Sequence, residues 1–297
     1  MMDSAAEQPA VGDVDRARSR LDVLVWRGKV AAHGAARLAR WAVQAASFPP
    51  PELAPATGFD HELYRAEVRV LRADGGADPR LESGKHVNVR LAAPAFDGLL
   101  VTPERPLSFW RVLGRVTEAA GYRHGMELRG GCVVPSLGGG LCLLSNALFE
   151  MAARLGWHIL ERHGHTVEAA PAPGALWGMD ATVLWPYVDL RVAPRAGRAR
   201  LEVAVRGGAL WLAAHGERPA AEASALEAID EGSESSGGEV FRRNRIFRRV
   251  TARETGEVVE EAVIAVNRKR LLAAAEVGRS CLTCERRDCH MRVAEVR

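Results

Sequence analysis

The sequence has no hydrophobic run that approaches the roughly 18 residues typical of a membrane-spanning helix. It also lacks the pattern of a secretion signal, a basic start followed by an apolar stretch, because residues 1–11 carry acids and a proline. We therefore expect a cytoplasmic protein.

An excess of one charge is also missing. The formal net charge of +3 over 297 residues is too small to indicate a nucleic-acid partner. The run from Phe241 to Arg249 does interleave aromatic and arginine side chains, which can stack on bases and pair with phosphates. A strand with one apolar and one solvated basic face explains the same run, and we favour that interpretation, with an anionic small molecule as a further alternative.

Cysteine is infrequent, with five residues in all, an odd number in a chain without an export signal. A disulfide framework is therefore not expected. Cys132 and Cys142 lie mid-chain, whereas Cys281, Cys284 and Cys289 crowd the last seventeen residues. Metal binding or thiol reactivity fits this distribution better.

Hydrophobic periodicity predicts an α+β fold in five segments. These are an N-terminal helical segment (1–51), a core domain (60–227), a flexible polar linker (228–239), a basic hairpin (240–275) and a cysteine-rich tail (276–297). In the core we expect a helix over 144–155 packed on a mostly antiparallel sheet, with strands near 64–71, 157–162, 181–187, 201–205 and 210–214, a helix or strand from 85 and a loop around 106–109. We expect the arginine-rich N-terminal helices to pack on the core, with membrane-surface contact as the alternative. Oligomeric state is not indicated.

A glycine-rich turn leads directly into the predicted core helix. The run Gly138-Gly139-Gly140-Leu141-Cys142 places a thiol in the first turn of that helix, where unpaired N–H groups and the positive end of the helix dipole favour a thiolate. The glycines also leave room for a ligand to approach the backbone. The candidate ligand-binding residues are Gly138, Gly139, Gly140, Ser145, Asn146 and Arg162.

Two histidines and an acid follow the cysteine. His163 and His165 end the strand that returns from the helix, and Asp180 opens the next one. This order is that of transglutaminase-like cysteine enzymes, in which a histidine accepts the thiol proton and an acid orients the ring. The candidate catalytic residues are therefore Cys142, His165, His163 and Asp180. A small buried cysteine at a tight helix start is the structural alternative.

The tail carries the motif C-x2-C-x4-C-H, formed by Cys281, Cys284, Cys289 and His290. A C-x2-C pair suits a tetrahedral metal because the short loop lets two thiolates converge, and we expect zinc. The alternative is an iron–sulfur cluster that takes its fourth ligand from Cys142 or Cys132.

Several separate motifs resemble a known family, in the right order. They are Leu107-Ser108-Phe109-Trp110, Gly121-Tyr122, Val134-Pro135, Gly138 to Cys142, Ser145-Asn146, Glu161-Arg162, His165, Ala181-Thr182-Val183 and Tyr187-Val188-Asp189-Leu190. From Leu81 to about Glu217 the chain resembles the VanW-like family of bacterial proteins, and the segment Arg243 to Arg249 resembles a later piece of longer members. The resemblance implies association with glycopeptide-resistance gene clusters, a cell-envelope link and no assigned biochemical role. Leu143 departs from the glutamine usual after the cysteine, and the family tolerates other residues at Asp180.

Three functions remain open from the sequence. The first is a thiol-dependent acyl-transfer or amide-cleaving enzyme that uses Cys142 and His165. The second is a non-catalytic, metal-stabilised protein that binds a small-molecule or peptide-like ligand or acts as an accessory protein. The third is an iron–sulfur protein in redox or sulfur handling, so the sequence leaves open whether the chain is an enzyme.

Overall fold

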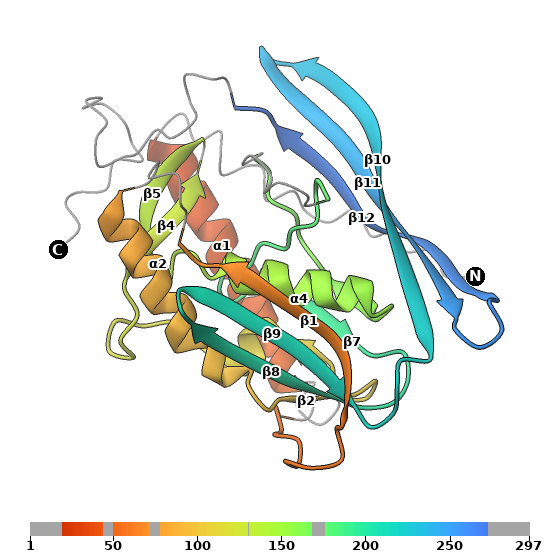
Figure 1. Cartoon of the computed structure of the whole chain (residues 1–297). Helices are drawn as coiled ribbons and strands as arrows, with labels where there is room; N and C mark the ends of the chain where they lie inside the picture. The colour runs from red at the N-terminus through yellow and green to blue at the C-terminus, as the bar shows by residue number, and fades with distance from the viewer. Residues whose placement is uncertain (1–19, 44–49, 72–77, 130, 168–175, 273–297) are drawn as a thin grey trace.

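The computed structural model describes residues 20–43, 50–71, 78–129, 131–167 and 176–272. In that part of the chain, few helices combine with mostly antiparallel sheets, so the predicted α+β class is confirmed (Figure 1). The predicted tail, with Cys281, Cys284, Cys289 and His290, lies outside the described residues.

The core is built on a four-stranded antiparallel sheet. Its order is β1 (His61–Arg69), β9 (Ala209–Gly216), β8 (Ala199–Arg206) and β2 (Leu100–Val101). Gly207 and Gly208 join β8 to β9, with φ of 58° and 80°. Positive φ at both positions matches the right-handed twist of a tight hairpin, so the Gly-Gly pair predicted this turn correctly.

Helix α4 (Cys142–Arg154) packs against this sheet (Figure 1). Leu144, Leu148 and Met151 recur at helical spacing and are fully buried in the core. Gly156, with φ of 70°, follows the helix end in the left-handed conformation expected of a terminating glycine. The predicted helix is confirmed, and it begins at the cysteine itself.

Among the described residues, three further α-helices flank the core: α1 (Arg20–Val43), α2 (Pro79–Ala92) and α3 (Phe109–Leu113). Asp78 caps α2 by accepting a hydrogen bond from the N–H of Arg80 at 2.9 Å, and Pro79 begins the helix. The segment from residue 85, for which the sequence allowed a helix or a strand, lies in the helix α2. The 3-10 turn η2 (Ala93–Ala95) follows this helix. None of the described helices is long and apolar enough to cross a membrane.

Two smaller sheets complete the core. One has the order β3 (Leu107–Ser108), β7 (Arg191–Ala193), β6 (His158–Glu161), and the other is the hairpin β4 (His124–Arg129) and β5 (Cys132–Leu137). The loop predicted around 106–109 is wrong: β3 runs directly into α3, and Asp189 stabilises the junction by binding the Ser108 hydroxyl at 2.6 Å and the N–H of Trp110 at 3.1 Å. The strand predicted over 181–187 is also wrong, because the chain turns back between Leu184 and Val188, which pair with each other.

A long three-stranded sheet follows: β10 (Glu222–Ser236), β11 (Glu239–Ala252) and β12 (Val258–Arg270) (Figure 1). The prediction of a flexible linker at 228–239 is wrong, because these residues form the end of β10, the Gly237-Gly238 turn and the start of β11. Their polarity reflects exposure and cross-strand ion pairs, such as Arg242 with Asp230 at 2.7 Å and Arg268 with Glu234 at 2.7 Å.

The arginine-rich run lies in β11, where we expected a strand. All five of its arginines face a carboxylate: the pairs are Arg242–Asp230, Arg243–Glu234, Arg245–Glu231, Arg248–Glu260 and Arg249–Glu261. Its basic charge is therefore compensated by acids from β10 and β12, in agreement with the interpretation as an ordinary strand.

Candidate thiol site

Cys142 is the first residue of α4, and a turn of three glycines precedes it. Gly138 and Gly140 have φ of 76° and 95°, values that L side chains rarely adopt. Leu141 caps the helix without a side-chain hydrogen bond, so the thiol lies at the positive end of the helix dipole. Cys142 is half-buried as a residue.

The glycines of this turn allow other parts of the protein, one backbone and one side chain, to approach closely. A Cβ on Gly139 would lie 2.4 Å from the carbonyl carbon of Gly125, and one on Gly140 would lie 2.1 Å from Cγ of Lys85. The side chain of Asn88 fixes the approach by donating to the carbonyl of Gly139 at 2.9 Å. The room that we expected for a ligand at Gly139 and Gly140 is therefore occupied by β4 and α2.

His165 joins the cysteine to an acid. Its Nδ1 lies 2.5 Å from Oδ2 of Asp180, and its backbone N–H donates to the same oxygen at 2.7 Å. The imidazole also hydrogen-bonds with the thiol of Cys142. Because Nδ1 is held by the carboxylate, Nε2 is the nitrogen left to meet the sulfur. The structure thus brings Cys142, His165 and Asp180 into one hydrogen-bonded chain.

Two cations hold the carboxylate of Asp180 from its other side. Lys269 donates to Oδ1 at 2.5 Å, and Arg162 donates to the same oxygen at 3.2 Å and to the backbone carbonyl of Asp180 at 2.6 Å. Burial alone would favour the neutral acid, but the hydrogen bond with His165 and the charges of Lys269 and Arg162 outweigh it. The pKa of Asp180 is therefore well below its usual range, and the group is a carboxylate.

The electrostatics favour a thiolate–imidazolium pair. Burial opposes the charged forms, yet hydrogen bonds to Asp180 and Cys142 raise the pKa of His165 to about 9. Burial likewise opposes a thiolate at Cys142, but the hydrogen bonds from His165, the N–H of Val183 and the hydroxyl of Thr182 lower the pKa of the thiol. The Thr182 oxygen lies 3.7 Å from the sulfur. Both shifts move the proton from sulfur to imidazole.

Three predicted ligand-binding residues hold this site together instead. Ser145 donates to the carbonyl of Ala181 at 2.6 Å, and Asn146 accepts from the N–H of Ala181 at 2.8 Å. These bonds fix the residue after Asp180 to the first turns of α4, and Arg162 fixes Asp180 itself. All three side chains are committed to positioning the acid relative to the cysteine.

His163 does not join the cysteine. Its Nε2 lies 3.2 Å from Oε1 of Glu161, and Arg37 of α1 binds the same carboxylate at 2.7 and 2.5 Å. Burial raises the pKa of Glu161, but the hydrogen bonds from His163 and Arg37 prevail and lower it to about 2. His163 therefore belongs to the ion pair that attaches α1, and His165 is the histidine of the thiol site.

The chain is similar in sequence to known proteins over the region that contains the thiol site. The family model described as VanW like protein matches residues 84–212. The chain therefore contains a VanW-like domain over these residues. It is 31% identical over 132 residues to the vancomycin B-type resistance protein VanW of Enterococcus faecalis, a match covering 44% of this chain and 48% of the relative. It is 36% identical over 104 residues to the uncharacterized protein YoaR of Bacillus subtilis, covering 35% of this chain and 33% of the relative. The matches thus span less than half of each relative, and no solved structure gives a significant match.

Cys142, His165 and Asp180 all lie inside the VanW-like domain, whereas Lys269 lies outside it. Lys269 was not predicted, because it follows Asp180 by 89 residues and only the pairing of β12 with β11 brings it there. Two asparagines of the same strands also hold the loop that leads to Asp180. Asn244 donates to the carbonyl of Trp177 at 2.7 Å, and Asn267 donates to that of Gly178 at 3.3 Å. The sheet that follows the VanW-like domain therefore holds the loop that carries its acid.

The predicted metal ligands of the tail are not among the described residues, and the described residues contain no group of three or more histidine, cysteine or acidic side chains able to hold a metal ion. Cys132 begins β5 at the end of the hairpin remote from the glycine turn. The zinc and iron–sulfur assignments stay predictions.

Proposed function

We propose that the VanW-like domain of this chain is a thiol-dependent acyl-transfer or amide-cleaving enzyme in which Cys142 is the nucleophile. The observation that carries the proposal is the hydrogen-bonded chain from the thiol through His165 to Asp180, closed by a 2.5 Å contact between imidazole and carboxylate. A nucleophile, a base within reach and a third group that orients the base are the parts that covalent acyl transfer requires.

The proposed reaction has two steps. The thiolate of Cys142 attacks the carbonyl carbon of an amide or ester, and the imidazolium of His165 gives its proton to the departing amine or alcohol, which leaves a thioester on the sulfur. Water or an acceptor amine then attacks the thioester while His165 removes its proton, and the thiolate departs as the new acyl bond forms. The imidazole gives one proton to the leaving group and takes one from the incoming water or amine, so each cycle restores the starting thiolate–imidazolium pair.

The surrounding residues have definite tasks in this scheme. Asp180 remains ionised and fixes the ring through Nδ1, which leaves Nε2 for proton transfer. The N–H of Val183 and the start of α4 stabilise negative charge on the sulfur before attack. Cys142 is half-buried as a residue, and the proposal requires a carbonyl group to reach the thiol from the exposed side of the helix start.

Alkylation of the folded protein by iodoacetamide across pH tests the nucleophile. Cys132 in the same chain is the internal control, because it lies on β5 away from the helix start. Peptide mapping by mass spectrometry should show that Cys142 reacts at a pH below that of an ordinary thiol, about 8.5. Equal pH profiles for the two cysteines would contradict the proposal.

Trapping of the acyl intermediate tests the reaction itself. Incubation with an activated acyl ester should leave one acyl group on the Cys142 peptide, and the Cys142→Ser variant should carry none there. His165→Asn should slow acylation, while His163→Asn, which alters the Glu161 ion pair, should leave it unchanged. A reactive thiol that never carries an acyl group would refute the acyl-transfer step alone.

A further inference from the structure

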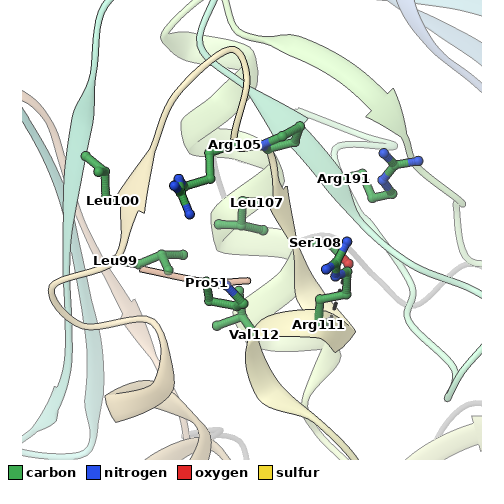
Figure 2. A pocket seen from close by; sticks show the side chains of 10 residues that line it. Pro51, Leu99, Leu100, Arg105, Leu107, Ser108, Arg111, Val112 and Arg191 are labelled. Atoms are coloured by element: carbon green, nitrogen blue, oxygen red, sulfur yellow. Dashed lines mark hydrogen bonds between the residues drawn. The ribbon is translucent and has the colours of Figure 1, made fainter. Parts of the chain in front are cut away.

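A small pocket with an apolar floor lies where β2, β3, α3 and β7 meet. Leu99, Leu107 and Val112 are among the apolar residues that line it, together with Pro51. Three arginines also line it: Arg105 from the loop after β2, Arg111 from α3 and Arg191 from β7. Figure 2 shows Arg105 and Arg111 on either side of Leu107, with Arg191 beyond Ser108. None of these arginines belongs to the thiol site.

The chain fixes the backbone that carries two of these arginines. The buried carboxylate of Asp189 accepts from the Ser108 hydroxyl at 2.6 Å and from the N–H of Trp110 at 3.1 Å, directly before Arg111. Ser108 in turn accepts from the N–H of Arg111 at 3.4 Å. Asp189 also lies two residues before Arg191 and pairs with the N–H of Leu190 at 3.0 Å. One acid thus holds the starts of α3 and β7, so both arginines are presented by a rigid frame.

Arg105 is held at the rim. Its guanidinium donates to the carbonyl of Pro50 at 3.0 Å and pairs with Glu52 at 2.9 Å. That pair is partly solvent-exposed, with 29% of the Arg105 side chain and 51% of the Glu52 side chain accessible. Screening by water weakens such a pair, so Glu52 offsets little of the positive potential inside the pocket.

Burial and the repulsion between neighbouring cations disfavour the charged forms of Arg111 and Arg191. Burial, and after it the charge of Arg191, lower the pKa of Arg111. Burial also lowers the pKa of Arg191, and the charges of Arg37 and Arg40 on α1 add to the effect against the acids Glu161 and Asp189. Like charges brought together in a partly buried place are relieved by a bound anion.

We propose that this pocket binds an oxyanion head group, a carboxylate or a phosphate, of an acidic small molecule. The planar fork of arginine matches both groups through paired N–H donors. The free volume of the pocket is about 20 Å³, room for one water-sized group. A single oxygen of the head group therefore enters the pocket, while the rest of the head group and of the molecule lies outside it, along the arginines and the apolar rim formed by Pro51 and Pro106.

Calorimetric titration of the full chain with inorganic phosphate, and separately with succinate, at low and constant ionic strength tests the proposal. We expect saturable binding of at least one anion, weakened roughly tenfold or more in Arg111→Met because a charged hydrogen-bond pair is lost. Arg111→Lys should retain part of the affinity, since it keeps the charge without the fork. Binding of phosphate alone or succinate alone would support the proposal and identify the head group.

The matched control is Arg198→Met, which removes an equally long cation from an exposed pair with Glu217. It should bind as the wild type does. Absence of saturable binding by the wild type, or equal weakening in Arg198→Met and Arg111→Met, would overturn the proposal. If Arg111→Met fails to fold, Arg105→Met at the exposed rim replaces it. Alkylation of Cys142 should be unchanged in the folded variants, so this test and that of the thiol site fail independently.

Discussion

Lys269 and Asp180 form a buried ion pair, with Nζ and Oδ1 2.5 Å apart and only 8% and 13% of the two side chains exposed. The pair joins β12, the last strand of the long three-stranded sheet, to the loop that bears the acid of the thiol site. Arg162 contacts the same carboxylate oxygen, so Asp180 balances two cations besides His165. The sheet beyond the family match is therefore an integral part of the site.

Replacement of Lys269 by methionine should lower the free energy of unfolding at pH 7 by roughly 3 kcal/mol, because it leaves a buried carboxylate with one partner fewer. Arg268→Met on the neighbouring residue is the control. Arg268 pairs with Glu234 in solvent, where 44% and 41% of the side chains are exposed, so we expect less than about 1 kcal/mol. Urea denaturation measures both. Equal losses would show that the Lys269 pair behaves as a surface pair.

Asp180→Asn should destabilise the fold at neutral pH and not in acid. The pKa of Asp180 is lowered, so its charge stabilises the folded state above the ordinary value of about 3.9, and this contribution is lost as pH falls from there towards the folded-state pKa. We expect a loss of roughly 3 kcal/mol at pH 7, because Lys269 and Arg162 keep their charges. Denaturation curves of the wild type and the variant should converge towards pH 2. A constant difference would contradict the assigned ionisation.

His165→Asn should raise the pH at which Cys142 is alkylated. The imidazolium favours the thiolate, so without it the midpoint should rise towards the ordinary thiol value of about 8.5. In the wild type, acyl transfer from an amide to Cys142 should decline as pH rises through about 9, where His165 loses the proton that the leaving amine needs. Alkylation quenched at fixed times across pH gives the midpoint for Cys142, and initial rates of acyl transfer across pH test the decline above about 9. His163→Asn is the control and should keep the wild-type midpoint.

Gly140→Ala should destabilise more than the same change at another left-handed glycine. Both Gly140 and Gly197 have positive φ, of 95° and 74°, but a Cβ on Gly197 meets nothing within 4 Å, whereas one on Gly140 lies 2.1 Å from Cγ of Lys85. Backbone strain should cost about 1–2 kcal/mol at either position, and overpacking should add roughly 1–3 kcal/mol at Gly140. Thermal and urea unfolding compare the variants. Equal destabilisation of the two variants would show that the Lys85 side chain moves aside with no cost in stability.

Zinc should accompany the purified full chain if Cys281, Cys284, Cys289 and His290 bind it as their spacing predicts. Elemental analysis should find stoichiometric zinc in the wild type and loss of it in Cys284→Ser. Cys132→Ser should retain the metal. Visible absorbance after anaerobic purification would instead favour the iron–sulfur alternative, and a metal-free wild type would remove both.

The sequence predicted the parts of the fold that leave a local signal. The helix at 142–154 has apolar residues at regular spacing, and the turn between β8 and β9 has the Gly-Gly pair that its backbone requires. The stretch 228–239 was mistaken for a linker because β10 is exposed along this part, so no apolar alternation marks it as a strand. Polar composition alone does not separate a solvated strand from a flexible segment.

The order of cysteine, histidine and acid was visible in the sequence and led us to pair Cys142 with His165, but the role of His163 was not visible. It depends on Glu161 and on Arg37 of α1, which take His163 away from the sulfur. Lys269 was invisible for a similar reason, since a contact across 89 residues has no local pattern. The glycine turn was recognised, but its physical purpose, the close approach of Gly125 and Lys85, required the partner backbones.

The wide separation of Lys269 from Asp180 in the sequence also sets an order of assembly. A ribosome finishes the cysteine, the histidine and the acid long before it reaches β12, and the carboxylate gains its ammonium partner only when that strand pairs with β11. A nascent chain therefore carries the sulfur before the full set of counter-charges exists. Maturation of the nucleophile is in this way tied to synthesis and pairing of β12.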